Sequence, residues 1–579
     1  MSGPRGDDAG GVAPGGAGED DRDRDPGLSR RQFVGGAAAL VAGLSLPAAL
    51  AGCGGSGDAA EAEATASASA ASPASGRPNL VFLITDQERS PQHWPDGWAD
   101  ENLPNRKRLA RNGLTFRRTF CAAAMCSPSR ASLFTGVYPA EHGVTEVLQY
   151  GEKDSEVSQG TLQPSRRNLA TVLAAAGYDV QYRGKWHMSK DPSGTLAVQG
   201  PRDLEQYGFL GWQPPDAGAD EASALFGGGT ADYDALTAAQ AADYLAAADP
   251  ASPRPFALFV CLVNPHDVMG CPKTWQDASE SDIAPFEGSR NYADDLPEAV
   301  EQGIGLPSTW DEPLRKNHKP HAQWQSTEMW SLGLKTVRTP QAMRDYVNFY
   351  AYLHKRADRD MGTVLDALDA NEGLADGTIV FRLSDHGEMG LAHGGMREKA
   401  YNAYEETIHV PLVVSNPRLF PEPVETDALA SLVDIMPTVA TLAGAPDRDS
   451  LTFVGRDLSP VIRAAADDPS KPAEPVQDSV LFTTDETLGS RGDRGGRGPV
   501  VKQPAHIRCI READWKFALY FDPAGEAAPE YELYDLRGDP EELRNMAAPD
   551  GPYYDKAKVA EMKQKLEARM AETNTTPGA

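Results

Sequence analysis

The sequence predicts an α/β fold, with a large, mostly parallel sheet sandwiched by helices and a smaller C-terminal α+β subdomain. Short apolar runs of strand length alternate with segments of helical periodicity, which is typical of a parallel sheet covered by helices. After about residue 450 the apolar runs follow one another without long helices between them, which indicates antiparallel strands. We therefore expect a main domain over residues 78–449 and a subdomain over residues 450–579.

The central strands are expected where apolar runs are short and continuous, because a strand buried on both faces carries apolar side chains on both. These runs cover residues 80–84, 179–183, 256–263, 378–384 and 409–415. Helices are expected over residues 168–176, 342–370 and 434–443. Gly177 and Gly444 end the first and the last, and the long middle helix repeats apolar residues every three or four positions.

The subdomain is expected to contain strands at 479–482, 506–510 and 515–520, followed by a charged helix over 555–570. Two stretches of the main domain, 190–250 and 266–340, are rich in Pro, Gly and Asp and show weak periodicity. We interpret them as surface insertions around the functional site. The Gly/Arg-rich stretch 489–498 is expected to be mobile.

Residues 1–53 are predicted to be an export signal. Ser29-Arg30-Arg31-Gln32-Phe33 is a twin-arginine motif, and the apolar stretch 34–50 is too short and glycine-rich for a membrane span. Leu50-Ala51-Gly52-Cys53 resembles a bacterial lipobox, so Cys53 is expected to be lipidated after passage through the twin-arginine translocase. The alternative is an ordinary signal peptide with an incidental cysteine. The acidic run before the motif is long for such a signal, which leaves the start codon open.

Residues 54–77 consist mainly of Gly, Ala, Ser and Glu, and are expected to be a disordered tether. The predicted location is therefore outside the cytoplasm, on the bacterial cell membrane through a lipid anchor. Such a location permits disulfides. The sequence leaves their existence open for the four cysteines not otherwise assigned, which are Cys121, Cys261, Cys271 and Cys509.

The net charge of −29 argues against a general nucleic-acid binder, since phosphate backbones favour basic surfaces. A small anionic substrate remains compatible, because a local basic pocket can exist in an acidic protein. Candidate residues for such a pocket follow three expected strands. Asp86 follows the first, His266 another, and Asp385-His386 a third. Functional groups collect at the carboxyl ends of strands in an open α/β sheet, so we expect these side chains to lie together.

The most specific motif is Cys126-Ser127-Pro128-Ser129-Arg130, followed by Ser132, Thr135-Gly136 and Tyr138-Pro139. The spacing Cys-x-Pro-x-Arg resembles the maturation motif of the type I sulfatases in the alkaline phosphatase superfamily, whose Cys is oxidised to formylglycine. The resemblance extends from Pro78 to about residue 547 and ends with 533–536, 539–541 and Asn545. It implies an alkaline phosphatase-like fold and a hydrolase that releases an alcohol and inorganic sulfate from a sulfate ester.

The resemblance implies one divalent metal ion held by Asp86, Gln87, Asp385, His386 and the modified residue at Cys126. Many members of the family have Asp-Asp at the positions of Asp86 and Gln87, and Asp-Asn at the positions of Asp385 and His386. The Asp-Gln and Asp-His pairs here are similar to those of choline sulfatases and phosphonate monoester hydrolases. Carboxylate oxygens favour Ca²⁺, which we expect, while the histidine nitrogen keeps Mn²⁺ and Mg²⁺ as alternatives.

Five further residues receive roles from the same resemblance. Arg130 would hold the formylglycine oxygens, and Lys185 and His187 would contact the sulfate and the aldehyde hydrate. His266 would face the leaving oxygen as general acid, and Lys399 would clamp the sulfate.

The chemistry explains why an aldehyde is made. Its hydrate carries two hydroxyls: one attacks sulfur after losing a proton to a carboxylate such as Asp385, and the other releases the sulfate as the aldehyde re-forms. A formylglycine-generating enzyme is therefore an implied partner, and the substrate would be a small-molecule or saccharide sulfate ester. Two alternatives remain. They are a phosphonate monoester or phosphodiester hydrolase on the same fold and a non-catalytic substrate-binding lipoprotein. An enzyme that uses the unmodified thiolate would not explain why two carboxylates and a metal site surround the cysteine.

Overall fold

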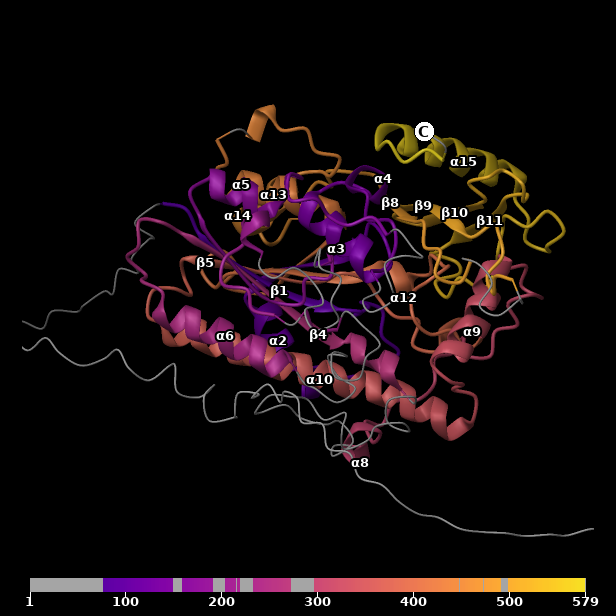
Figure 1. Cartoon of the computed structure of the whole chain (residues 1–579), viewed down its shortest axis with the longest axis horizontal. Helices are drawn as coiled ribbons and strands as arrows, with labels where there is room; N and C mark the ends of the chain where they lie inside the picture. The colour runs from indigo at the N-terminus through magenta and orange to yellow at the C-terminus, as the bar shows by residue number, and fades with distance from the viewer. Residues whose placement is uncertain are drawn as a thin grey trace, which may run out of the picture. The chain divides into compact units, whose positions relative to one another are not determined.

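Figure 1 shows the computed structural model of the chain, which contains two β-sheets with helices packed against them. The structure describes residues 76–148, 159–190, 204–214, 216–218, 233–271, 296–446, 448–471, 473–490 and 498–577. The chain divides into two compact units, Met1–Ala68 and Ser69–Ala579, and all described residues belong to the second. The predicted export signal, nearly all of the predicted tether and most of the predicted mobile stretch lie outside the described residues.

The larger sheet has seven strands in the order β3-β4-β1-β5-β6-β2-β7. The strands are β1 (Asn79–Asp86), β2 (Gly113–Phe120), β3 (Asp179–Gly184), β4 (Phe256–Pro265), β5 (Thr378–Ser384), β6 (His409–Ser415) and β7 (Val424–Ser431). Strand β1 runs parallel to its neighbours β4 and β5, and the pairs β3–β4 and β2–β7 are also parallel. Strand β6 is antiparallel to both β5 and β2. The predicted mostly parallel sheet is confirmed.

Both faces of this sheet are covered, as Figure 1 shows. The α-helices of the described residues are α1 (Trp98–Asn102), α2 (Pro104–Arg111), α3 (Cys126–Thr135), α4 (Pro139–His142), α5 (Leu169–Ala175), α6 (Asp234–Ala247), α8 (Leu296–Ala299), α9 (His321–Gly333), α10 (Pro340–Ala370), α11 (Ala392–Gly395), α12 (Glu405–Ile408), α13 (Ile435–Leu442), α14 (Ser459–Asp467) and α15 (Lys556–Glu572). Helices α2, α6 and α10 cover one face, and α3, α5, α13 and α14 cover the other.

Strand β1 shows why the central strands are apolar throughout. Val81 and Leu83 pack toward α6 and α10, whereas Leu80, Phe82 and Ile84 pack into the core on the opposite face. Successive side chains of a strand point to opposite faces, so a strand covered on both sides needs an apolar residue at every position.

The smaller sheet is antiparallel, in the order β11-β10-β9-β8. Its strands are β8 (Ser479–Thr484), β9 (His506–Glu512), β10 (Trp515–Phe521) and β11 (Glu530–Asp535). Helix α15 packs on this sheet, with Met562, Leu566 and Met570 buried in its core. The predicted antiparallel strands and the charged helix are confirmed, while β11 was not predicted as a strand.

The prediction that 190–250 is only a surface insertion is wrong for α6. Ala238, Ala241 and Leu245 of this helix are buried against β4 and α10. The helix is alanine-rich, and small side chains let it approach α10 closely without a strong hydrophobic stripe in the sequence. The described cysteines, namely Cys121, Cys126, Cys261, Cys271 and Cys509, are buried free thiols.

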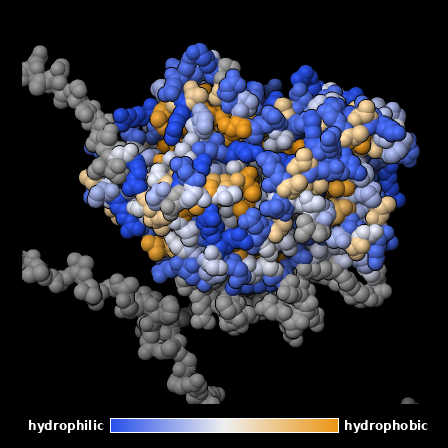
Figure 2. Space-filling model, turned by 90° about the horizontal axis from the view of Figure 1, so that it is seen from above, coloured by the Kyte–Doolittle hydropathy of each residue, from blue (hydrophilic) through white to orange (hydrophobic). Residues whose placement is uncertain are grey.

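The face shown in Figure 2 is mainly hydrophilic, with hydrophobic side chains in small separate groups. Such scattered groups are ordinary for a protein surface in water. Within the described residues, no helix is both long enough and apolar enough to cross a lipid bilayer.

Candidate active site

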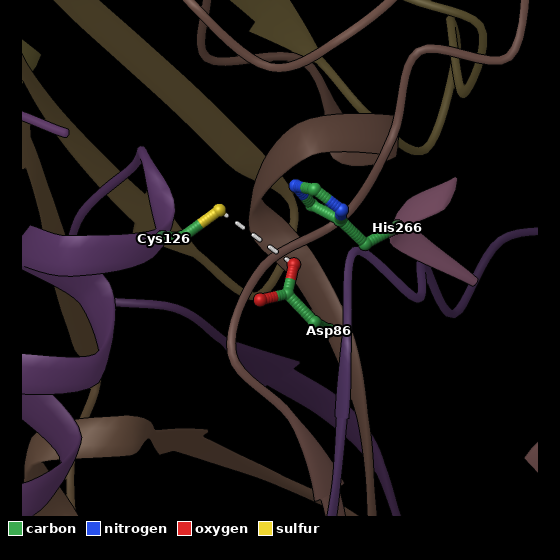
Figure 3. Close-up of side chains that lie close together, drawn as sticks. All are labelled: Asp86, Cys126 and His266. Atoms are coloured by element: carbon green, nitrogen blue, oxygen red, sulfur yellow. Dashed lines mark hydrogen bonds between the residues drawn. The ribbon is translucent and has the colours of Figure 1, made fainter. Parts of the chain in front are cut away.

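The predicted site residues meet at the carboxyl ends of three adjacent strands, β4, β1 and β5. Asp86 is the last residue of β1, Asp385 and His386 follow β5, and His266 begins the short 3₁₀ turn after β4. Cys126 is the first residue of α3, which brings it to the same place. All five side chains are buried, at 4% exposure or less. Figure 3 shows Asp86, Cys126 and His266 pointing toward one another from separate elements.

Two carboxylates and one imidazole lie around the thiol of Cys126. Its Sγ atom is 3.6 Å from Oδ1 of Asp86 and 3.1 Å from Nε2 of His386. The Nε2 atom of His386 is also 3.6 Å from Asp86 Oδ1 and 3.8 Å from Asp385 Oδ1. One donor atom from each of Asp86, Asp385 and His386 lies within 4.8 Å of the others. This buried set of two oxygens and one nitrogen fits a divalent cation, whose charge would offset the two carboxylates.

Lysine ammonium groups face the same carboxylates. Nζ of Lys185 lies 2.6 Å from Oδ2 of Asp86, and both side chains are fully buried. Burial favours the neutral acid, but the charges of Lys185 and of nearby histidines outweigh it and hold the pKa of Asp86 well below its ordinary value. Burial, together with repulsion from Asp86, raises the pKa of Asp385. The site therefore concentrates charges of both signs in a volume closed to solvent.

Gln87 lies between Glu388 and Lys399. Its side-chain Nε2 donates to Oε2 of Glu388 at 2.5 Å, and its Oε1 accepts a hydrogen bond from Lys399. Its backbone N–H donates to Oδ1 of Asp385 at 3.2 Å. Lys399 also contacts Oε2 of Glu398 at 3.0 Å. Because only the amide nitrogen can donate to Glu388, the amide oxygen of Gln87 must face the ammonium group of Lys399.

Arg130 connects α3 to the turn after β3. Its guanidinium donates to the carbonyl oxygens of Trp186, at 3.0 Å, and Lys185, at 2.6 Å. It also donates to Oδ2 of Asp385 at 3.3 Å. The resemblance assigned Arg130 to the oxygens at position 126, and these contacts add a second task, which is to fix the backbone that carries Lys185.

His187 has a defined tautomer. Its Nε2 lies 2.8 Å from the carbonyl oxygen of Leu148, and a carbonyl can only accept, so Nε2 carries the proton. Burial and the charge of Lys185 lower the pKa of His187 well below its ordinary value, so the ring is neutral. Nδ1 therefore holds the lone pair and can act as a base.

His266 lies across from Cys126, as Figure 3 shows. One ligand atom each from Asp86, Cys126 and His266 lies within 4.8 Å of the others. Burial and the charge of Lys185 lower the pKa of His266 well below its ordinary value. The structure thus brings His266 to the thiol, from the side of the cluster opposite to α3.

His393 belongs to a separate ionic network. Its Nδ1 lies 2.6 Å from Oε2 of Glu312 and its Nε2 lies 3.5 Å from Oε2 of Glu406. Its ring stacks on Tyr404 with the ring centres 3.7 Å apart. These contacts are those of a buried structural side chain.

Sequence reasoning missed two buried carboxylates that contact this site. Glu388 fixes Gln87, and its position three residues after Asp385 in the same loop was a usable signal. Asp216 accepts hydrogen bonds from the backbone N–H groups of Trp186 and His187, each at 2.7 Å. It lies in the stretch interpreted as an insertion, where no motif marks it.

Comparison with known proteins shows the family to which the chain is similar. The sulfatase family model matches residues 78–445. The choline-sulfatase of Rhizobium meliloti (strain 1021) is 27% identical over 503 residues, which cover 83% of this chain and 84% of the relative. The steryl-sulfatase of Mus musculus is 29% identical over 436 residues, which cover 68% of this chain and 66% of the relative.

Two solved structures share the fold. A 2-O GAG sulfatase superimposes with a TM-score of 0.61 at 20% identity, covering 86% of this chain and 93% of the other. The phosphonate monoester hydrolase of Agrobacterium radiobacter superimposes with a TM-score of 0.59 at 20% identity. The match covers 86% of this chain and 96% of the other.

Proposed function

Since the chain belongs to the sulfatase family, we propose that it hydrolyses sulfate esters with a formylglycine made from Cys126 and one divalent metal ion. Its relatives include sulfatases of choline, steroid and saccharide esters, and the chain is accordingly a sulfuric ester hydrolase. The observation that carries the proposal is the position of Cys126, which begins α3 with its Sγ between Asp86 and His386. In the unmodified chain this sulfur stands in for the oxygens of the hydrated aldehyde.

The metal ion would be held by Asp86, Asp385 and His386, with Gln87 and the modified residue as further ligands. Ca²⁺ is the proposed ion, and Mn²⁺ and Mg²⁺ are the alternatives that a nitrogen ligand allows. When bound, the ion would polarise the attacking hydroxyl and offset negative charge on the sulfuryl group.

Formylglycine would supply a hydrate with two hydroxyls, one to attack sulfur and one to allow release of sulfate. A formylglycine-generating enzyme in the same cell is the proposed partner for this maturation. The neutral His187, with its lone pair on Nδ1, suits the acceptance of a proton from the second hydroxyl. Lys185 and Lys399 are the cations proposed to bind the sulfate oxygens.

His266 is proposed to donate a proton to the leaving alcohol. A general acid must be protonated, and burial lowers the pKa of His266 in the protein alone. A bound ester adds a negative charge beside the ring, and an adjacent negative charge raises the pKa of an imidazole. The substrate would thus favour the protonation state that its own cleavage requires.

Export and anchoring are part of the proposal. The twin-arginine motif at 29–33 and the lipobox ending in Cys53 support a lipoprotein outside the cytoplasm. The twin-arginine route carries folded proteins, so the formylglycine would be made before export. The substrate would be a small-molecule or saccharide sulfate ester that reaches the cell surface.

A phosphonate monoester hydrolase is the second candidate. The pairs Asp86-Gln87 and Asp385-His386 support it, because they resemble those of phosphonate monoester hydrolases as well as those of choline sulfatases. The fold is common to both activities.

Turnover of matched esters tests both candidates. The protein would be purified from a host with a formylglycine-generating system, beside Cys126→Ala, and assayed on an aryl sulfate and on the matching phosphonate monoester. We expect a preference for the sulfate that Cys126→Ala abolishes. A preference for the phosphonate with the same dependence on Cys126 would replace the proposed activity by the second candidate.

A further inference from the structure

The turn that carries Lys185 and His187 has its backbone groups held from two sides. The N–H groups of Trp186 and His187 donate to Oδ1 and Oδ2 of Asp216, each at 2.7 Å. The carbonyl oxygens of Lys185 and Trp186 accept from Arg130 on the other side. His187 has a φ angle of 52°, in the left-handed region that is unfavourable for a residue with a side chain. The carboxylate of Asp216 thus stabilises a backbone conformation that the sequence would not adopt by itself.

The turn that carries His266 is held in the same way. The N–H groups of Val263 and Asn264 donate to Oδ1 and Oδ2 of Asp234, at 2.6 and 2.8 Å. Strand β3 ends beside Cys261, at Gly184, so β4 continues past the end of its neighbour on that side. Buried N–H groups need acceptors, and Asp234 supplies them where the strand is missing.

Both carboxylates come from the stretch between β3 and β4. Asp216 is 1% exposed and Asp234 is 0% exposed. A Cβ atom at Gly218 would lie 2.6 Å from Cγ1 of Val263 and 3.4 Å from Nζ of Lys185, so the backbone near Asp216 packs against both turns. The stretch that looked like a surface insertion therefore lies beside the two turns that end in histidines of the site.

We propose that Asp216 and Asp234 are positioning residues, which set the orientation of His187 and His266 respectively by binding the backbone before each ring. This inference rests on the proposed function, because it takes the roles of the two histidines from there. Neither carboxylate is proposed to touch the substrate. Each acts through a pair of hydrogen bonds, which its two carboxyl oxygens accept from neighbouring backbone N–H groups.

The two histidines have different tasks, so the two carboxylates are distinguishable. His266 would protonate the leaving alcohol, which matters more for a basic alkoxide than for an acidic phenol. His187 would act in the release of sulfate, after the alcohol has left. Loss of Asp234 should therefore increase the dependence of the rate on the leaving group, whereas loss of Asp216 should slow all esters alike.

The test uses Asp216→Asn and Asp234→Asn, which keep the shape but place an amide N–H₂ against one of the two N–H donors. Each protein is made with a formylglycine-generating system, and mass spectrometry measures formylglycine content so that rates refer to matured enzyme. The kcat values are compared on nitrophenyl sulfate and on a primary alkyl sulfate. We expect Asp234→Asn to lower kcat about tenfold more on the alkyl ester than on the aryl ester. We expect Asp216→Asn to lower kcat by about a hundredfold on both.

Asp358→Asn is the matched control. Asp358 is 2% exposed and accepts the backbone N–H groups of Asn105 and Arg106 at the start of α2, at 3.0 and 2.7 Å. The Asp358→Asn variant should lose stability as the Asp216 and Asp234 variants do, while its kcat stays within about twofold of the wild-type value. Two results would overturn the inference: kcat values of the Asp216 and Asp234 variants that equal those of the control, or an unchanged ratio of alkyl to aryl rates in Asp234→Asn. Wild-type enzyme that hydrolyses neither sulfate nor phosphonate esters would overturn the proposed function, and this inference with it.

Discussion

Single side chains at this site carry charge in surroundings that exclude water. Arg130, Lys185, Asp86 and Asp385 have fully buried side chains, and the ion pairs Arg130–Asp385 and Lys185–Asp86 join them. Separating such a pair leaves an uncompensated buried charge, which costs more than loss of a surface pair. Stability and activity therefore depend on the same residues here.

Arg130→Lys tests whether stability depends on the hydrogen-bond geometry of the guanidinium group as well as on its charge. Lysine keeps the charge but cannot reach Asp385 and the carbonyls of Lys185 and Trp186 together. We expect the free energy of unfolding to fall by about 3 kcal/mol, measured by urea denaturation of the unmodified protein so that maturation does not enter. Arg117→Lys is the control, because Arg117 pairs with Asp427 at the surface and should change stability by less than about 1 kcal/mol. Equal effects of the two substitutions would contradict the prediction.

Metal binding gives a second prediction at this scale. Asp86, Asp385 and His386 form a preformed set, so an ion that binds the folded state should stabilise it by about 2.7 kcal/mol at a hundred times its Kd. After treatment with a chelator, the Tm should rise on addition of Ca²⁺ or Mn²⁺, as measured by calorimetry. His386→Asn replaces the nitrogen by an oxygen, and should reduce the shift with Mn²⁺ more than the shift with Ca²⁺. A wild-type Tm insensitive to every divalent ion would refute this assignment.

The residues that the sequence identified share one property, which is a place in a short motif. Cys126 and Arg130 stand four positions apart, and Asp385 and His386 are neighbours, so local spacing could reveal them. Asp216 acts through contacts with a distant segment, the backbone N–H groups of Trp186 and His187. No local pattern records such contacts, which explains why Asp216 could not be predicted, whereas the place of Glu388 just after Asp385 and His386 was a signal that could have been used.

At the scale of elements, uniform burial made the central strands the clearest to predict. Strands β1, β4 and β5 are buried at every position and appear as continuous apolar runs. Strand β2 contains the partly exposed Arg117 and Arg118, and β7 alternates at its start, so neither run is continuous. An apolar run also does not indicate whether a strand lies parallel or antiparallel to its neighbours. The antiparallel orientation of β6 is seen only in its pairing with β5 and β2.

The network around α11 and α12 gives a prediction about pH. Burial alone would lower the pKa of His393, but Glu406 and Glu312 outweigh burial and raise it to about 9. A raised pKa means that the folded state binds the proton more tightly than the unfolded state. The stabilisation is therefore complete below the unfolded pKa of about 6.5 and is lost as the pH rises through about 9. Its size would be about 3 kcal/mol at most.

Urea denaturation between pH 6 and pH 9.5 measures this loss. His393→Gln should be less stable than wild type at pH 6 and should lose much less of its stability over the same range. His318→Gln is the control, since His318 lies partly exposed beside Asp550 and should leave the slope as it is in wild type. A wild-type stability that stays flat as the pH rises would contradict the assignment.

At the scale of the whole described unit, one hydrophobic core joins the two sheets. Phe120 and Cys121, which precede α3, share a cluster with Phe482 and Ile507 of the smaller sheet. The backbone of Thr483 donates to the carbonyl oxygen of Ala122 at 2.9 Å, four residues before Cys126. The smaller sheet therefore supports the segment that carries the proposed nucleophile, and we expect the two sheets to unfold together.

Lys516 tests this coupling. It lies on β10, and its Nζ contacts Glu542 and, at 3.3 Å, Glu405 of α12, which leads into β6 of the larger sheet. Lys516→Met leaves Glu405 and Glu542 close together with one cation fewer, and should lower the free energy of unfolding by about 3–5 kcal/mol. Near- and far-ultraviolet circular dichroism should follow one shared transition, shifted to lower urea. Lys565→Met, which removes a half-exposed pair with Glu512, should shift it by less than about 1 kcal/mol. If Lys516→Met instead produced an early transition that left the larger sheet folded and the enzyme active, the smaller sheet would be an independent unit and its support of Cys126 would be dispensable.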